Sequence, residues 1–401
     1  MKNFCSTGTF VALSLLCAGP AVQQSLAASS PVAYVYLQTN EGINVYDASS
    51  TGALTLVKGS PFQAGGTWIE ADNGKYMFTF DAANNIHTYA IESNGTIGSQ
   101  VAEVYAGNYD GAKCSGETQG FEVFRGVLDH TGKSLYVQLF GYATDNTGGV
   151  EAVCSSYQYY QVGSNGKLTF NGSYSFADNC CEPEQNLTFT GSDKFVYGTS
   201  EVDPAAPDFQ SFERLSNGAL ERLKVTAEVP PAPGPDYTWL PALIDADPNG
   251  HAAILGIFDS NEVNGGTSGW KIASYTVGGS GDLTTSNTYA ELVSPLVIPT
   301  VFNFSPSGDI LAAAGSGQGD NGGLQVFHWN GSKPPTAFGG ALTDASQVYA
   351  IHWDNNNHLY AVGNDDKIYV YTITTSKVTA AGSPVSFTGG LTGQGLIVRP
   401  L

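Results

Sequence analysis

Three polar residues, Asp245, Asn303 and His352, occupy the same position in three similar segments of the sequence. The segments are "LIDADPNGHAAILG" from Leu243, "PTVFNFSPSGDILAAAG" from Pro299 and "AIHWDNNNHLYAVG" from Ala350. If these segments lie side by side around a common axis, a carboxyl group comes close to an imidazole, and such a pair can exchange protons with a substrate. The same side chains could instead satisfy one another's hydrogen bonds in a buried, water-filled channel, and we favour this structural role.

A second position lies two residues earlier in these segments and in four comparable ones. It is occupied by Gly395, Thr67, Arg125, Asn186, Leu243, Val301 and Ala350. Arg125 is the single cation of this set, and a guanidinium group can bind a carboxylate through two parallel hydrogen bonds. The predicted ligand-binding residues are therefore Arg125, Asn303, Thr67 and Asn186. The alternative, which we favour for Arg125, is a salt bridge to one of three acidic residues in a neighbouring loop, Asp178, Glu182 or Glu184.

Four cysteines lie beyond the N-terminal segment, namely Cys114, Cys154, Cys180 and Cys181. An even number of cysteines in an exported protein predicts two disulfides, with three possible pairings. The alternatives are a vicinal Cys180–Cys181 bridge, or a metal site that combines these thiols with Asp178 or Glu182. The spacing matches no metal-binding motif, so we predict neither a metal nor another cofactor.

Two stretches rich in Asp, Asn and Gly could supply oxygen ligands for Ca²⁺: "DSNEVNGG" from Asp259 and "GQGDNGG" from Gly317. Ordinary turns use the same residues, and we favour turns here. The sequence contains no serine nucleophile elbow, zinc-binding HExxH motif, phosphate-binding loop or dinucleotide fingerprint. No motif of a common enzyme class therefore identifies a reaction.

The N-terminus reads "MKNFCSTGTFVALSLLCAGPAVQQSLAASS", which is one lysine, an apolar run from Phe10 to Ala18, and then small residues. This order is typical of a secretory signal peptide, here residues 1–28, with cleavage expected after Ala27 or Ala28. A lipid anchor at Cys17 is a poorer match, because Leu15 and Leu16 stand where small residues are needed. The apolar run is too short to span a bilayer. We expect a protein that is secreted, periplasmic or held at the cell surface.

The chain is acidic, with a formal net charge of −20 and only 16 Lys and Arg in 401 residues. Nucleic acids and anionic membranes attract basic clusters, so neither is expected as a partner. High net charge also keeps an exported protein soluble. The predicted partner is a small molecule, a glycan or a surface protein, bound by a monomer.

An aromatic residue followed six positions later by glycine recurs five times. The pairs are Tyr46–Gly52, Tyr89–Gly95, Tyr160–Gly166, Phe212–Gly218 and Tyr275–Gly281. A fixed offset between a strand aromatic and a glycine predicts a repeated hairpin, because glycine readily adopts the positive φ of a tight turn. Two further aromatics, Phe327 and Tyr371, precede the different turns "NGSK" and "TTSK". Seven hairpins are therefore expected.

Each hairpin follows an apolar segment, a polar turn and a second apolar segment, so each unit holds four short strands, A to D. Seven such units predict an all-β fold, a seven-bladed β-propeller that spans residues 29–401 as one domain. The first unit lacks strand A, and "GLIVRPL" from Gly395 should complete blade one and close the ring. The B–C and D–A loops then share one face, the loop face, where we expect the ligand at the channel mouth. His130, His251 and His358 fall in A–B turns on the opposite face.

The segments "STGALTLVKGSPF" from Ser50 and "PTVFNFSPSGDILAAAG" from Pro299 resemble the seven-bladed propellers of the 6-phosphogluconolactonase-like lactonase family. The resemblance covers essentially the whole mature chain and implies the propeller fold. It also implies a site where His and Arg at the start of certain strands A bind substrate and assist ring opening. At that position this chain has Arg125 but no histidine. We therefore expect an exported propeller that binds a ligand or surface partner through its loop face. The alternative is a divergent lactonase, or another hydrolase acting on a lactone or sugar-derived substrate.

Overall fold

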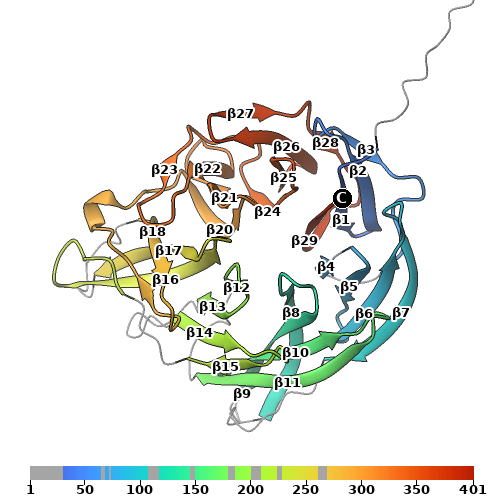
Figure 1. The fold of residues 1–401 in the computed structure, drawn as a ribbon, viewed down its shortest axis with the longest axis horizontal. Helices are drawn as coiled ribbons and strands as arrows, with labels where there is room; N and C mark the ends of the chain where they lie inside the picture. Colours follow the sequence, from blue (N-terminus) through green and yellow to red (C-terminus); the bar gives the residue numbers. More distant parts are fainter. Residues whose placement is uncertain are drawn as a thin grey trace, which may run out of the picture. The chain divides into compact units, whose positions relative to one another are not determined.

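The computed structural model describes residues 30–64, 68–71, 74–106, 117–144, 150–178, 186–199, 209–223, 228–260 and 269–401. Within the unit Pro31–Leu401, seven antiparallel sheets are arranged as the blades of a β-propeller (Figure 1). The predicted fold class is confirmed. The one helix in these ranges is a 3₁₀ turn, η1 (Tyr289–Glu291), and no described helix has the length and hydropathy to span a membrane. The predicted signal peptide lies outside the described residues.

Each blade runs from the inner strand A to the outer strand D, and the strands are given in that order. Blade one is β29 (Leu391–Pro400), β1 (Ala33–Thr39), β2 (Gly42–Ala48) and β3 (Leu54–Leu56). Blade two is β4 (Trp68–Ala71), β5 (Tyr76–Phe80), β6 (Asn85–Ile91) and β7 (Ile97–Tyr105). Blade three is β8 (Glu117–Leu128), β9 (Ser134–Thr144), β10 (Val150–Val162) and β11 (Leu168–Asp178). Blade four is β12 (Asn186–Phe189), β13 (Phe195–Thr199), β14 (Phe209–Arg214) and β15 (Leu220–Arg222).

The last three blades follow the same order. Blade five is β16 (Tyr237–Ala246), β17 (His251–Ser260), β18 (Lys271–Val277) and β19 (Leu283–Thr284). Blade six is β20 (Val297–Phe304), β21 (Ile310–Gly317), β22 (Leu324–His328) and β23 (Thr336–Ala337). Blade seven is β24 (Val348–Trp353), β25 (His358–Gly363), β26 (Lys367–Thr374) and β27 (Lys377–Ala380), with β28 (Val385–Ser386) paired to β26.

The C-terminal strand β29 closes the ring. It pairs antiparallel with β1, and Val398 lies opposite Val35 while Ile397 lies opposite Tyr36. The two ends of the propeller chain therefore share one sheet, which confirms the predicted closure. An unclosed ring would expose the edge of β1 and the apolar faces of two blades.

Among the described residues, the core consists of seven clusters of buried apolar side chains, one between each pair of neighbouring blades. The cluster between blades seven and one, for example, packs Val362 and Ile368 against Val35 and Val398. The strands B are covered on both faces, and β1, β13 and β25 are buried at every position. Strands of this kind need apolar residues on both faces, which is the pattern seen in the sequence.

The repeated glycines lie in the C–D turns and have positive φ. Their values are 78° at Gly52, 80° at Gly95, 77° at Gly166, 85° at Gly218 and 90° at Gly281. Each of these glycines donates its N–H to the carbonyl three residues earlier, at 2.8–3.0 Å. The hairpin interpretation of the repeat is therefore confirmed.

The C–D turns also join neighbouring blades. Tyr36 on strand B of blade one donates its hydroxyl to the Gly95 carbonyl of blade two, at 2.9 Å. Tyr136 of blade three bonds the Gly218 carbonyl of blade four, and Tyr197 of blade four bonds that of Gly281 in blade five, both at 2.8 Å. The turn thus recurs because it forms the C–D hairpin and because its glycine carbonyl accepts a hydrogen bond from a strand B tyrosine of the preceding blade.

Removal of residues 395–401 should open the ring. The deletion takes away the pairing of β29 with β1 and exposes the apolar faces of blades one and seven. We expect a sharp fall in the melting temperature, measured by circular dichroism, because each blade packs only against its two neighbours. The control is Lys377→Ala in the outer strand β27, which should leave the melting temperature almost unchanged. An equal melting curve for the deletion and the full chain would contradict the closure.

Gly95→Ala should destabilise the fold more than Gly319→Ala. Both glycines have positive φ, 80° and 63°, which costs alanine about 1–2 kcal/mol. A Cβ at position 95 would overlap the Tyr34 ring, whereas a Cβ at position 319 would meet no other atom within 4 Å. Urea denaturation should therefore give a loss of about 3 kcal/mol at Gly95 and about 1 kcal/mol at Gly319. Equal losses in the free energy of unfolding for the two variants would show that a Cβ at position 95 does not clash with Tyr34 of blade one.

Candidate functional site

A cavity of about 500 Å³ lies on the propeller axis, where the strands A converge. Five consecutive blades contribute polar side chains to its wall. These are Arg125 and His130 from blade three, Thr188 from blade four, Asp245 from blade five, Asn303 from blade six and His352 from blade seven. Blade one contributes the apolar residues Leu396 and Ile397. The volume is within the range typical of small-molecule sites.

The cavity lies toward the A–B turns, and we call it the turn-side cavity. Asp245, Asn303 and His352 each stand one residue before the end of their strand A. The rim includes His130, Pro248 and Pro306, which are exposed residues of A–B turns. The sequence places the ligand on the loop face, whereas this polar set lies at the other end of the channel. The difference arises because the polar positions are at the ends of the strands A, not at their beginnings.

Asp245 is hydrogen-bonded and has an altered proton affinity. One oxygen of its carboxyl group, Oδ1, accepts hydrogen bonds from the Thr188 hydroxyl at 2.7 Å and from the Ala246 N–H at 3.0 Å. Burial raises the pKa of Asp245 to about 7, although these bonds and the nearby His130 oppose the shift. Near neutral pH this carboxyl group can therefore either hold or release a proton.

His352 and Asp245 have different hydrogen-bond partners. His352 uses Nδ1 to donate to the carbonyl of Trp353, at 3.1 Å, and burial lowers its pKa. A neutral ring bonded in this way leaves Nε2 as an acceptor. Blade six, which carries Asn303, lies between the two groups. The three polar residues therefore line one cavity, but the proton-exchanging pair suggested by the sequence is not joined by a direct hydrogen bond.

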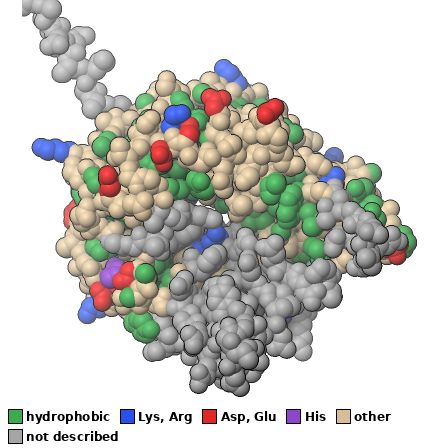
Figure 2. Space-filling view, turned by 180° about the vertical axis from the view of Figure 1, so that it is seen from behind, with side chains coloured by type: hydrophobic (Ala, Val, Ile, Leu, Met, Phe, Trp, Pro, Cys, Tyr) green, Lys and Arg blue, Asp and Glu red, His purple; other side chains and the backbone are tan. Residues whose placement is uncertain are grey.

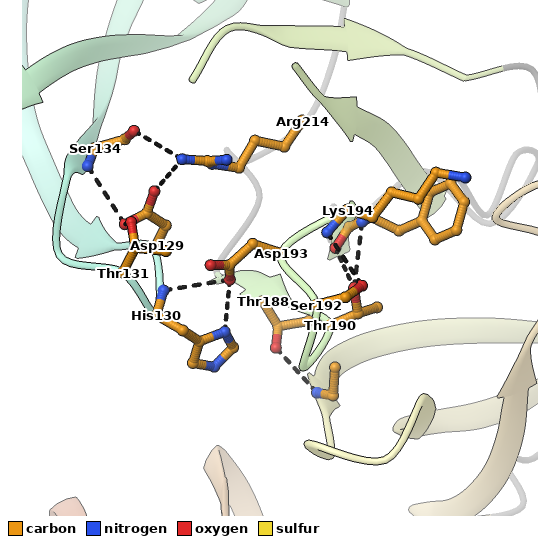
Figure 3. Close-up of polar contacts among 12 residues, drawn as sticks. Asp129, His130, Thr131, Ser134, Thr188, Thr190, Ser192, Asp193, Lys194 and Arg214 are labelled. Atoms are coloured by element: carbon orange, nitrogen blue, oxygen red, sulfur yellow. Dashed lines mark hydrogen bonds and ion pairs between the residues drawn. The ribbon is translucent and has the colours of Figure 1, made fainter. Parts of the chain in front are cut away.

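His130 and Asp193 form an ion pair across two blades at the rim (Figure 3). Oδ1 of Asp193 accepts from Nδ1 of His130 at 2.6 Å and from its backbone N–H at 3.2 Å. The bond to Asp193 is the main cause that raises the pKa of His130. Next to this pair, Arg214 of blade four bonds the buried carboxylate of Asp129 in blade three. The His130–Asp193 pair thus joins the A–B turns of blades three and four, and the Arg214–Asp129 pair joins β14 of blade four to the A–B turn of blade three.

The other predicted site residues have different outcomes. Arg125 lines the turn-side cavity, whereas Thr67 and the side chain of Asn186 lie outside the described residues. Cys114, Cys180, Cys181 and the side chain of Cys154 also lie outside them, as do Glu182, Glu184 and the side chain of Asp178. The described residues contain no group of three or more His, Cys, Asp or Glu side chains arranged to hold a metal. Of the two Asn/Gly-rich stretches, 317–323 forms a turn in which Asn321 donates to the Gln318 carbonyl.

The face opposite to that of Figure 1 carries few charged side chains in its described part, and those of either sign are scattered (Figure 2). Uncharged polar atoms and backbone dominate this surface. No basic cluster of the kind that binds nucleic acid is visible among the described residues there.

No known protein family and no curated protein matches the sequence. Solved structures with a similar fold exist. A Bacteroides fragilis protein, provisionally assigned as a 6-phosphogluconolactonase, has 14% identity and a TM-score of 0.60, with 91% of this chain and 97% of that chain covered. A Lactobacillus plantarum protein has 15% identity and a TM-score of 0.60, with 92% and 99% covered.

A third similar structure is the Cps50 (Swd1) β-propeller domain of Myceliophteria thermophila, with 9% identity and a TM-score of 0.50. The alignment covers 84% of this chain and 91% of that domain. At such identities the similarity shows the fold. The chain therefore has the propeller fold that the resemblance to the lactonase family implied.

Asp245 should make the stability of the protein depend on pH. Its pKa is about 7 when folded and about 4 in an unfolded chain. Between these values the native carboxyl group holds a proton that the unfolded chain has released, so the free energy of unfolding falls as the pH rises and levels off above about 7. Urea titrations should therefore give a flatter pH profile for Asp245→Asn than for the wild type. The exposed Asp320→Asn is the control, and an identical profile for Asp245→Asn would contradict the prediction.

Proposed function

We propose that this protein binds a small polar ligand in the turn-side cavity. One observation carries the proposal: polar side chains from five consecutive blades converge on one cavity of about 500 Å³. Partial burial of polar groups costs free energy unless they are hydrogen-bonded. A channel that served only packing would favour side chains such as Leu396 and Ile397, which blade one supplies at the same site. The polar wall therefore favours ligand recognition over packing.

The residues at the wall suit a ligand with hydroxyl groups. Thr188, Asn303 and the protonated form of Asp245 can each donate and accept hydrogen bonds, and the neutral His352 ring offers an acceptor. Arg125 is a donor that can hold a carboxylate. A sugar or a sugar acid fits this combination. Thr67 and Asn186 stay in the proposal because they occupy the position equivalent to Arg125 in the sequence repeats before and after it.

A divergent lactonase or another hydrolase is the second candidate. The Bacteroides fragilis structure of the same fold is provisionally assigned as a 6-phosphogluconolactonase. In this chain the observation that favours hydrolysis is Asp245, whose pKa of about 7 suits proton transfer at neutral pH. At the position where the family places histidine, Arg125 is the only residue with related chemistry. We therefore place ligand binding first.

The setting of this function is also a proposal. The N-terminal segment favours export, so we propose a secreted, periplasmic or surface-located monomer with disulfides among its four later cysteines. The ligand would then be a molecule met outside the cytoplasm, such as a glycan fragment, or a group displayed by a surface protein.

Arg125→Ala should weaken the binding of an anionic ligand and spare that of a neutral one. Gluconate and glucitol are suitable probes, since both are open-chain polyols and differ only in the carboxylate. We expect isothermal titration calorimetry to show a loss of about 1–3 kcal/mol for gluconate, the usual cost of a charged hydrogen bond. Lys194→Ala, a cation outside the cavity, is the control. The proposal is wrong if neither probe, nor glucono-1,5-lactone, binds the wild-type protein.

His352→Ala should change stability rather than chemistry. His352 is bonded to a backbone carbonyl and not to Asp245, so it is expected to act as a structural part of the wall. The rate of glucono-1,5-lactone hydrolysis should be the same for this variant and the wild type, while the melting temperature falls. Hydrolysis by the wild type that disappears in His352→Ala, with the fold intact, would contradict this role and favour the lactonase alternative.

A further inference from the structure

Three Asp–His ion pairs occur in the A–B turns of the described residues, and one of them differs from the others. His251 bonds Asp247 and His358 bonds Asp354, each within a single turn and at a separation of four residues. His130 bonds Asp193 of the next blade. His130 alone of these three histidines lines the turn-side cavity. The first two pairs stabilise their own turns, whereas the third holds an imidazole at the mouth of a cavity.

The chemistry of this pair fixes the role of each ring nitrogen. An ionised carboxylate only accepts hydrogen bonds, so Nδ1 of His130 must carry the hydrogen shared with Asp193. In the neutral ring, Nε2 then has a lone pair and can accept a proton. The His130 side chain is 58% exposed while Asp193 is 7% exposed, so the carboxylate is shielded and the imidazole faces the solvent of the cavity mouth. An Asp that orients a His in this way is a recurring arrangement for general bases.

A proton donor lies in the same cavity. Asp245 holds its proton up to about neutral pH, as described above, and lines the same cavity as His130. The charged groups that act on His130 are Asp193, Asp245 and Asp129. The Asn303 side-chain amide, on the same cavity wall, can donate to an oxygen that becomes negative.

We propose that the turn-side cavity hydrolyses small carboxylic esters, with His130 as the general base, Asp193 as the residue that positions it, and Asp245 as the general acid. The inference rests on the proposed function, because the ester must first bind in the cavity. It goes beyond that function in assigning a reaction to residues at the mouth.

The reaction needs only water as co-reactant. Nε2 of His130 removes a proton from water, and the water oxygen forms a bond to the acyl carbon. The bond between that carbon and the alcohol oxygen then breaks, while Asp245 gives its proton to the leaving oxygen. Proton return from His130 to Asp245, directly or through water, restores both groups. The products are one carboxylic acid and one alcohol.

The test uses hydrolysis of 4-nitrophenyl acetate by the full chain. His130→Gln should lower kcat at least 100-fold, the usual contribution of a general base, and leave KM within about threefold. His251→Gln is the matched control, since it changes an equivalent Asp–His pair outside the cavity, and it should keep the wild-type kcat. Equal losses in the two variants, or no hydrolysis by the wild type above the His130→Gln rate, would overturn the proposal.

The pH profile separates catalysis from stability. With an alkyl ester such as methyl acetate, whose alcohol needs a proton to leave, the wild-type rate should rise as His130 loses its proton and fall as Asp245 loses its own, above about pH 7. Asp193→Asn removes the charge that raises the pKa of His130, so the rising limb should move to lower pH. An unmoved limb in a folded Asp193→Asn variant would overturn the role of His130. Gluconate titrations on the same proteins identify which proposal fails. If the wild type binds gluconate but does not hydrolyse the ester, only the catalytic inference is rejected. If the wild type neither binds gluconate nor hydrolyses the ester, the proposed binding site is rejected too.

Discussion

The pairing of β29 with β1 is the constraint on which the rest of the structure depends. Each blade has apolar side chains on both faces, so it is stable only between two neighbours, and a row of blades is complete only as a ring. Closure also fixes the radius at which the seven strands A stop. The strands cannot reach the axis, and the space that remains is filled by side chains or kept as a cavity. In this chain five blades contribute polar as well as apolar side chains to the cavity wall, and blade one contributes Leu396 and Ile397. The cavity is therefore a consequence of ring closure, and residues near the ends of the strands A supply its polar side chains.

The A–B turns show how one repeated turn can differ in its hydrogen bonds from blade to blade. In blades five and seven the turn begins with a buried aspartate, Asp247 or Asp354, which accepts backbone N–H bonds from its own turn. In blade four Thr190 takes this place and bonds the N–H of Phe195. The aspartate of this turn is Asp193, three residues later and at a positive φ of 55°. Its carboxylate is thus available to blade three, where it holds His130.

The sequence predicts the fold well because a propeller repeats its signals. The offset between aromatic and glycine predicts the hairpins, and the missing first strand A predicts the closing strand. The same alignment of repeats brings Asp245, Asn303 and His352 to one place, since equivalent positions in neighbouring blades face the same axis. It does not predict the bond between His130 and Asp193, which are 63 residues apart. Nor does it predict that the polar cavity lies toward the A–B turns, because this depends on how far along each strand the polar residue stands.

Fold and chemistry are separable in this architecture. The contacts that hold the blades together lie between their sheets, while the residues of the cavity lie at the ends of the strands A. Asp245, Asn303 and His352 line the cavity and belong to none of the clusters between blades, whereas their neighbours Phe302 and Ile351 belong to both. The same separation places Asp245 where water is partly excluded but blade contacts do not fill the space. Its pKa of about 7 follows from that position, since a more exposed carboxyl group would ionise near 4 and a fully packed one would need a partner. The chemistry of the site thus depends on the space that ring closure leaves open.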